Sequence, residues 1–307
     1  MPADGFRAQV GLLLRVLPFV AAERCFALKG GTAINLFVRN LPRLSVDIDL
    51  VYLPVADRES SLTDIRAALH RIAQALRGAL RNVAVSENAN EEGTRVLVRQ
   101  ATAQIKIEVT PVLRGTVHAP EVLPVVPAVE EAFGYAETQL VSFADLYAGK
   151  LVAALDRQHP RDLFDVRYLL ANEGIDAPLF QTFLAYLISS GRPAHELIKP
   201  RFKDITQAFS REFVGMTVDP VSMDELLGTR ETMVEILRQH LDDSARRFLM
   251  TFHELQPDWD ALGLPTAQDL PAIRWKIRNL ERLCDEQPDR YRKMLSDLNE
   301  AFEGPSQ

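Results

Sequence analysis

Two aspartates separated by one residue are the groups in this chain with the clearest potential for chemistry. Residues Val46–Leu50 read Val-Asp-Ile-Asp-Leu, and this alternation predicts a strand with Asp47 and Asp49 on one face. Their Cα atoms would lie roughly 6.5 to 7 Å apart, so the two side chains could share divalent metal ions about 3.5 to 4 Å apart. Without metals or another partner, the two charges would repel each other.

A pair of glycines precedes this strand by one loop. Phe26–Leu28 is a short apolar run, and Thr32–Phe37 has a helical pattern. Between them, Gly30 and Gly31 permit a tight turn and close backbone approach. A turn that opens a helix presents free N–H groups and the positive end of the helix dipole to phosphates. Taken alone, such a pair more often marks a plain turn, but beside the aspartates it predicts adjacent phosphate and metal sites.

A third acid lies on a later stretch with the same alternation. In Ala103–Val109 aliphatic residues alternate with polar ones, which places Lys106 and Glu108 on one face. Because Arg95–Val98 is also strand-like, the two stretches predict a hairpin that brings Glu108 near the aspartate strand. The alternative is an ordinary exposed Lys/Glu face of an antiparallel sheet. Since two aspartates already require metals, we interpret Glu108 as the third ligand.

The order of these motifs resembles a known superfamily. Gly-Gly-Thr, then Asp-x-Asp, then one acid on a later strand is the order in nucleotidyltransferases related to DNA polymerase beta. More closely, Leu28–Thr32 and Pro42–Leu50 resemble the AbiEii/AbiGii toxin family, nucleotidyltransferase-like toxins of bacterial abortive-infection and toxin–antitoxin systems. The gap between Gly31 and Asp47 is longer than in the wider superfamily and matches this family.

A second block supports the resemblance, which covers roughly residues 20–170. Asp145–Leu155 is similar to the family's lysine motif, and Pro160–Val166 is similar to its Arg-Asp-Leu-Tyr/Phe-Asp motif. Helical spacing places Lys150 within or beside an apolar stripe, where a lysine either extends its amine to solvent or meets an anion. A bound triphosphate would be such an anion.

Two acids of this block share the apolar face of the next predicted helix and therefore need partners. For Asp162 and Asp165 the ordinary partners would be Arg161, Arg167 or the helix dipole. The functional partners would be Lys150, the nucleotide or the acceptor hydroxyl. The resemblance favours Asp165 as the functional acid and leaves Asp162 as the alternative.

The element pattern and the resemblance together predict an α+β fold. We expect a small mixed β-sheet nucleotidyltransferase domain with flanking helices over residues 1–115, and a proline-rich connector over 116–141. A mainly α-helical C-terminal domain over residues 142–307 would contribute Lys150 and Asp165 to the cleft.

The resemblance implies a metal-dependent nucleotidyltransferase that moves NMP from an NTP to an acceptor. Asp47, Asp49 and Glu108 would bind Mg²⁺, with Mn²⁺ as the alternative cofactor. Lys150 and Asp165 complete the catalytic set. For Arg43 and Ser45 a plain loop role is the alternative. The predicted nucleotide-binding residues are Lys29, Gly30, Gly31, Thr32, Arg43, Ser45 and Lys150.

The resemblance also implies an acceptor and a partner. Some members use RNA acceptors such as the tRNA 3′ end, so the expected outcome is a toxin that blocks translation and is neutralised by a cognate antitoxin. One alternative is nucleotidyl transfer to a small molecule or a protein side chain. Another is a non-catalytic NTP-binding module, although the retained glycines, aspartates and Lys150 argue against a dead site.

Composition limits the remaining classes. The chain is 47% hydrophobic, which is enough for a substantial core. Its length of 307 residues favours two domains. A net charge of −7 argues against avid nonspecific nucleic-acid binding, since that requires concentrated Lys and Arg. The six histidines have no close pair, which argues against zinc. No P-loop, dinucleotide-binding or esterase motif occurs.

Cysteine use and the N-terminal sequence predict a cytoplasmic protein. Cys25 and Cys284 are far apart in sequence, so a disulfide framework is not expected and a reducing compartment fits. The apolar stretch Val10–Ala22 is interrupted by Arg15 and Pro18, is too short to span a membrane and lacks a cleavage-site pattern.

Overall fold

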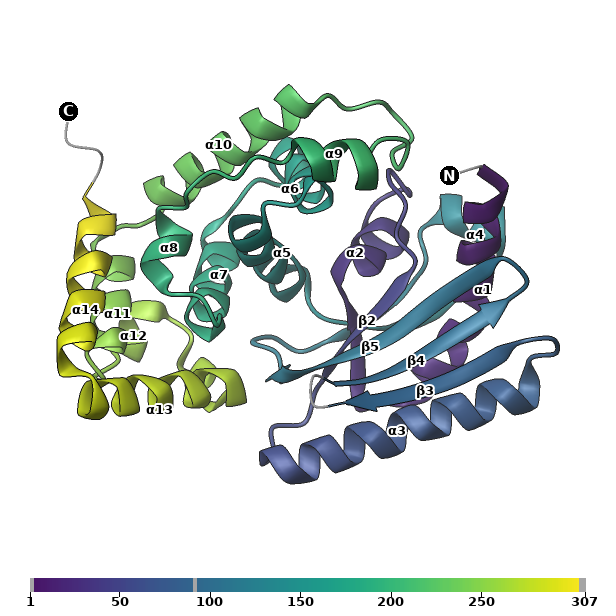
Figure 1. Ribbon diagram of the computed structural model, residues 1–307, viewed down its shortest axis with the longest axis horizontal. Helices are drawn as coiled ribbons and strands as arrows, with labels where there is room; N and C mark the ends of the chain where they lie inside the picture. Colours follow the sequence, from purple (N-terminus) through teal and green to yellow (C-terminus); the bar gives the residue numbers. More distant parts are fainter. Residues whose placement is uncertain (1–2, 91–92, 304–307) are drawn as a thin grey trace. The chain divides into compact units, whose positions relative to one another are not determined.

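The computed structural model describes residues 3–90 and 93–303, which group into two compact units (Figure 1). The first unit holds Met1–Ser142 together with Val214–Pro220, and the second holds Phe143–Phe213 and Val221–Gln307. The chain therefore leaves the first unit, returns to it for one short segment and leaves it again. The predicted α+β class is confirmed, with a mixed sheet in the first unit and helices in the second.

A seven-stranded mixed sheet is the centre of the first unit. Strand β2 (Asp47–Tyr52) pairs antiparallel with β1 (Phe26–Lys29) and parallel with β5 (Ala103–Arg114). The strand order is β3-β4-β5-β2-β1-β7-β6, in which the outer strands are β3 (Ala84–Asn90), β4 (Gly93–Gln100), β6 (Glu121–Pro124) and β7 (Glu137–Leu140). The predicted hairpin is confirmed, since β4 pairs antiparallel with β5.

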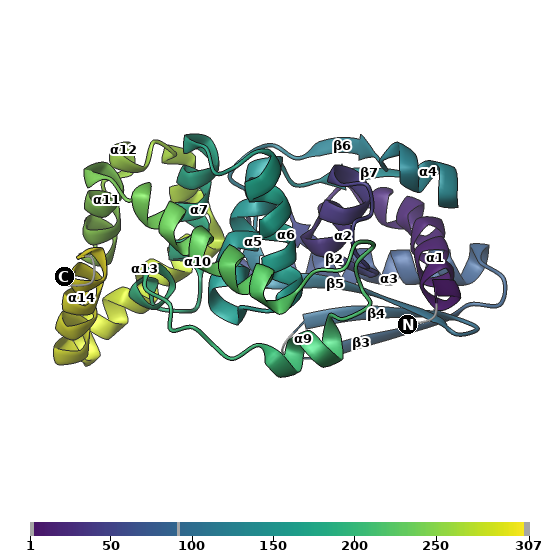
Figure 2. The same cartoon turned by 90° about the horizontal axis from the view of Figure 1, so that it is seen from above.

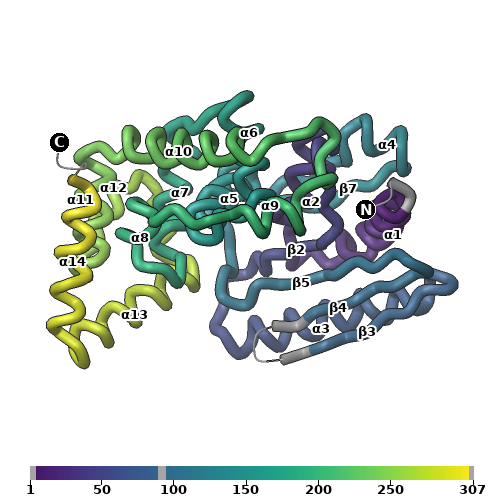
Figure 3. Tube along the Cα trace, turned by 45° about the horizontal axis from the view of Figure 1, so that its top comes forward, coloured from purple at the N-terminus to yellow at the C-terminus, as the bar shows by residue number. Residues whose placement is uncertain are grey.

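The alternating sequence of the central strands separates a buried face from a polar one. Ile48 of β2 and Ile107 of β5 are fully buried, whereas the acids between the aliphatic residues are half-buried. Helix α1 (Ala3–Ala21) packs against β5 and β7, and α3 (Arg58–Ala79) packs against β3 and β4 (Figure 3). These helices give the aliphatic side chains a core, so the charged side chains are left for the other face of the sheet.

The helix predicted after the glycine pair is also present. Helix α2 (Gly30–Ala33) begins at the first glycine and continues as a π-helical turn over Ile34–Val38. Asn35, which is fully buried, donates a hydrogen bond of 2.8 Å to the carbonyl of Gly31. The turn is therefore tied to the helix that it opens.

Residues 116–141, predicted as a connector, contain regular structure. They supply β6, the short helix α4 (Pro127–Phe133) and β7, and β7 pairs parallel with β1. Strand β6 is at the edge of the sheet, and edge strands tolerate proline because one row of their N–H groups has no strand partner. Pro124 ends β6 and Pro127 begins α4, so these prolines lie at the ends of short regular elements.

Every regular element described in the second unit is helical (Figure 2). Helix α5 (Phe143–Arg157) packs against α6 (Pro160–Asn172) and α7 (Ala177–Ser189). Between α7 and α10 the chain forms two short helices, α8 (Ala194–Ile198) and α9 (Thr206–Glu212). The remaining helices are α10 (Met223–Gln239), α11 (Asp243–His253), α12 (Trp259–Leu262), a 3-10 turn (Pro265–Asp269), α13 (Pro271–Glu286) and α14 (Pro288–Phe302).

Candidate active site

Strand register builds a row of charged residues across the centre of the sheet. The row consists of Lys29 on β1, Asp49 on β2, Glu108 on β5 and Arg95 on β4, each opposite the next. Residues directly opposite each other on paired strands face the same side. Asp47 precedes Asp49 by two residues and is opposite Lys106, so it faces that side as well. Three acids and three basic residues therefore share one face of four adjacent strands.

Glu108 is held by two cations of this face. Its Oε1 is 2.6 Å from Arg95 Nε, and its Oε2 is 2.6 Å from Lys106 Nζ. Desolvation lowers the pKa of Lys106, but the hydrogen bond to Glu108 and the charges of the nearby acids outweigh it and raise that pKa overall. Lys106 therefore remains protonated at neutral pH and serves as a counter-charge to the acids.

Both glycines of the turn are required by close approach of side chains. Gly30 has a φ of 77°, and a Cβ there would lie 2.7 Å from Asp49 Oδ2. A Cβ on Gly31 would lie 2.7 Å from Arg43 Nη2 and 2.7 Å from Ser45 Oγ. A Cβ at either position would have to displace the side chains that it meets, and at Gly30 the positive φ favours glycine in addition.

Thr32 and Arg43 connect the turn to neighbouring backbone. Thr32 is 0% exposed, and its hydroxyl donates to the carbonyl of Asp47 and lies 3.2 Å from Ser45 Oγ. Arg43 is 3% exposed, and its Nη1 donates to the carbonyl of Leu44 at 2.8 Å. The hydroxyl of Thr32 and the guanidinium of Arg43 thus fix the geometry of the turn and of the strand that follows.

Gly31→Ala is expected to lower the efficiency of nucleotidyl transfer about a hundredfold, because the added methyl group must displace Arg43 or Ser45, and misplacement by about 1 Å can cost that much. The effect is expected mainly in KM for NTP. Gly78→Ala is the matched control, since a Cβ there meets nothing within 4 Å. Equal kinetics in the two variants would contradict the tight-turn assignment.

Lys150 and its two acids form a separate buried cluster in the second unit. Lys150 Nζ on α5 is 2.8 Å from Asp162 Oδ1 and 2.9 Å from Asp165 Oδ2, both on α6. All three residues are buried. Arg157 adds a contact of 2.8 Å to Asp162, whereas Arg167 pairs with Glu225. The sequence left two alternatives for Lys150, an amine extended to solvent or an amine paired with an anion. The structure shows the second, with both aspartates as the anionic partners.

The acids on this face of the sheet fit a divalent cation in chemistry, although they do not form a complete metal site. Asp47 and Asp49 supply the hard carboxylate oxygens that Mg²⁺ and Mn²⁺ prefer. Within residues 3–90 and 93–303, no three acids, histidines or cysteines are gathered closely enough to hold a metal. Glu108 is in register with Asp49 but is engaged by Arg95 and Lys106. A cation at the aspartates would gain Glu108 only in exchange for these ion pairs.

Lys106→Gln is expected to tighten Mn²⁺ binding by about threefold to tenfold, because it removes a positive charge that competes with the metal for the acids. Calorimetric titration of Mn²⁺ without nucleotide measures this directly. Lys293→Gln is the control, since this exposed lysine pairs with Asp297 on α14. Weaker Mn²⁺ binding in Lys106→Gln would mean that the lysine orders the site instead of opposing the metal.

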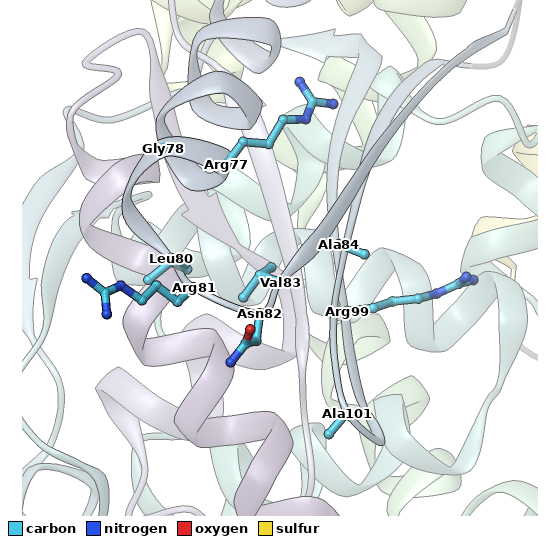
Figure 4. Close-up of a pocket in the computed structure, with 9 residues that line it drawn as sticks. All are labelled: Arg77, Gly78, Leu80, Arg81, Asn82, Val83, Ala84, Arg99 and Ala101. Atoms are coloured by element: carbon cyan, nitrogen blue, oxygen red, sulfur yellow. The ribbon is translucent and has the colours of Figure 1, made fainter.

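A hollow of about 780 Å³ in the first unit is lined by none of the charged-row residues. It lies beside the end of α3 and the start of β3, and its charged side chains are Arg77, Arg81 and Arg99. Figure 4 shows these three guanidinium groups pointing away from one another, and Arg77 pairs with Glu87 at 2.8 Å. Because no set of groups converges there, we place the candidate site on the charged row.

Sequence reasoning missed three parts of this arrangement. The sequence pattern placed Lys106 on the same face as Glu108 and gave Arg95 no role, so the ion pairs that both make with Glu108 were missed. Alternation along both strands already indicates that these residues lie beside the acid. The return of residues 214–220 to the first unit has no local sequence signal.

Comparison with known proteins decides the family. The family model described as nucleotidyl transferase AbiEii toxin of a type IV toxin–antitoxin system matches residues 11–279. The chain belongs to the AbiEii toxin family. This AbiEii protein is therefore a nucleotidyltransferase toxin whose substrate is an NTP, in a family that typically uses a divalent metal.

A solved structure shares the fold of this AbiEii protein. MenT4, a nucleotidyltransferase toxin from Mycobacterium tuberculosis H37Rv, is similar with a TM-score of 0.61 and 17% sequence identity, over 91% of this chain and 94% of that chain. No curated protein matches the sequence. In the described part of the chain, no helix is long and apolar enough to cross a membrane.

Proposed function

We propose that this AbiEii protein transfers NMP from an NTP to the 3′ end of an RNA, with the reaction centred on Asp47 and Asp49. The observation that carries the proposal is the charged row, in which Asp49 lies over Gly30 and in register with Glu108. A turn that offers backbone N–H groups beside the two aspartates of one strand suits a triphosphate and its metals. We propose Mg²⁺ as the physiological cofactor, with Mn²⁺ as a substitute.

The acids have separate tasks in this scheme. Asp47 and Asp49 would hold the divalent ions, which would neutralise charge on the triphosphate and polarise the acceptor hydroxyl. Glu108 is the third carboxylate of the set, and it is the acid best placed by register to take the hydroxyl proton beside Asp49. Arg95 and Lys106 hold Glu108 in its orientation until substrates arrive.

The phosphate side of the site is assigned to the turn and its neighbours. Gly31 and Thr32 offer backbone N–H groups at the start of α2, and Lys29 lies at the end of β1 opposite Asp49. Ser45 supports the turn through its contact with Thr32. Arg43, being buried, acts mainly by holding the turn in shape.

Lys150 and Asp165 are proposed as the contribution of the second unit. Their similarity to the lysine and Arg-Asp-Leu-Phe-Asp motifs of the family supports a role for Lys150 on the phosphate tail. Asp165 Oδ2, 2.9 Å from Lys150 Nζ, would position that ammonium group. Asp162 also pairs with Lys150 but contacts Arg157 as well, so we assign Asp162 a structural role.

The acceptor and the antitoxin rest on family membership. We propose RNA, in particular the tRNA 3′ end, because transfer there would block translation, and we propose that a cognate antitoxin neutralises the toxin. The test is incubation of the purified protein with each α-labelled NTP, Mg²⁺ and separate pools of RNA, protein and small molecules, with EDTA as the control. We expect Mg²⁺-dependent label in the tRNA band alone. Label found only in protein or in small molecules would show that the acceptor is not RNA. Label transfer that persists in EDTA would show that the reaction needs no divalent metal.

A further inference from the structure

A remote segment of the chain is bonded to the loop that carries Arg43. Residues 214–220 return from the second unit to the first. Thr217 forms an antiparallel bridge with Arg43, Leu44 N–H donates to Met216 O at 2.8 Å, and Val218 N–H donates to Pro42 O at 2.9 Å. In Figure 1 this is the green loop after α9, which meets the purple loop before β2. We name residues 214–220 the return segment.

The loop that receives these bonds is irregular and strained. Between the π-helical turn and β2, the chain forms no helix and no strand apart from the bridge at Arg43. Leu41 has a φ of 54°, a conformation that non-glycine residues rarely adopt. Such strain persists only where surrounding contacts determine the backbone. The bonds from the return segment are contacts of this kind.

The return segment holds the loop through its backbone rather than its side chains. Val214 and Val218 are 62% and 73% exposed, so their side chains add little to the core. The hydrogen bonds from Val218 to Pro42 and from Leu44 to Met216 join main-chain atoms. The position of the segment therefore depends on which N–H and C=O groups it presents.

The loop transmits this position to the glycine turn through Arg43. The Arg43 side chain is buried, and its Nη2 lies 2.7 Å from the position that a Cβ of Gly31 would take. Ser45 Oγ contacts the same point from the other end of the loop. A shift of the loop away from the return segment would withdraw Arg43 and leave the Gly30–Gly31 turn without support.

We propose that the return segment is a positioning element of the nucleotide site, which holds Arg43 against Gly31 and so fixes the phosphate-binding shape of the turn. The proposal rests on the proposed function, in which this turn binds NTP phosphates. Arg43 acts here as a positioning residue, and the return segment acts only through it. An NTP site would thus depend on a distant part of the chain, since Val218 follows Arg43 by 175 positions.

The test measures NTP affinity by calorimetry without acceptor, in the full-length protein. Val218→Pro removes the N–H that donates to Pro42, and it is expected to weaken NTP binding about threefold to tenfold, the value of one hydrogen bond. Val218→Ala keeps that N–H and loses only exposed side-chain atoms, so it is expected to bind NTP like the wild type. Arg43→Gln is expected to weaken binding at least as much as Val218→Pro.

The double variant separates this proposal from a general structural effect. If the return segment acts through Arg43, then Arg43→Gln with Val218→Pro binds NTP no more weakly than Arg43→Gln alone. Fully additive losses would overturn the proposal, as would wild-type affinity in Val218→Pro when Arg43→Gln is impaired. If Val218→Pro binds NTP normally and Arg43→Gln does not, the NTP site is retained and only the role of the return segment is lost. If the wild-type protein binds no NTP, the proposed function itself is wrong.

Hydrogen exchange provides a second measurement should Val218→Pro fail to fold. In the wild-type protein we expect the amide of Leu44 to be protected, and we expect NTP to slow exchange further in residues 214–220. In Arg43→Gln that NTP-dependent slowing should be absent. Equal slowing in both proteins would show that the segment responds to nucleotide without Arg43, contrary to the proposal.

Discussion

Asp49→Asn is expected to reduce nucleotidyl transfer on the order of a thousandfold, equivalent to about 4 kcal/mol of transition-state stabilisation. Asn has nearly the shape of Asp but removes one of the two negative charges that the divalent ions need. The fold is expected to survive, because Asp49 is half-buried on the polar face and contributes nothing to the aliphatic core. Asp47→Asn is expected to act in the same direction.

The measurement is the initial rate of label transfer from an α-labelled NTP at saturating Mg²⁺, with thermal unfolding of each variant recorded in parallel. Asp285→Asn, an exposed acid on α13, is the control and should transfer at the wild-type rate. An Asp49→Asn protein that is folded and transfers within a few fold of the wild type would remove Asp49 from the catalytic set.

Lys150→Met is expected to destabilise the second unit by about 3 to 5 kcal/mol, the cost of removing one partner from a buried ion pair. The substitution removes the ammonium group that contacts both Asp162 and Asp165, whereas the contact of the largely exposed Arg157 with Asp162 remains. Denaturant unfolding followed by a probe of helix content measures the change. Lys293→Met, which breaks an exposed pair, should change the free energy of unfolding by less than about 1 kcal/mol.

Asp165→Asn separates the structural role of this cluster from its proposed role in catalysis. The variant keeps the Lys150–Asp162 pair, so a smaller loss of stability is expected than in Lys150→Met. If Asp165 positions Lys150 for the triphosphate, transfer should fall by more than the loss of folded protein explains, with KM for NTP raised. Parallel losses of activity and stability in both variants would make the cluster purely structural.

The central strands could be predicted from sequence because their period of two fixes both the element and its faces. Asp47 and Asp49 alternate with residues that must be buried, and the same holds for Glu108, so the shared polar face follows from pattern alone. The turn at Gly30 could be predicted for a different reason, since glycine pairs mark backbone conformations that other residues rarely adopt.

The remaining features depend on contacts that a local pattern does not contain. Strands β6 and β7 have four residues each and lie among prolines, too short for alternation to identify them. The ion pairs of Glu108 depend on the register between β4 and β5. Helical spacing predicts that Asp162 and Asp165 share one face of α6. That both contact the amine of Lys150 follows only from the packing of α5 against α6.

Pyrophosphate release tests the central claim most directly, because it follows the chemistry at the Asp47 and Asp49 strand whatever the acceptor is. Wild-type protein, the Asp47→Asn/Asp49→Asn double variant and the Asp285→Asn control would be compared with NTP, Mg²⁺ and total RNA. We predict release by the wild type and the control, and release at least a thousandfold slower in the double variant and in EDTA. Release at the wild-type rate by the folded double variant would contradict the account.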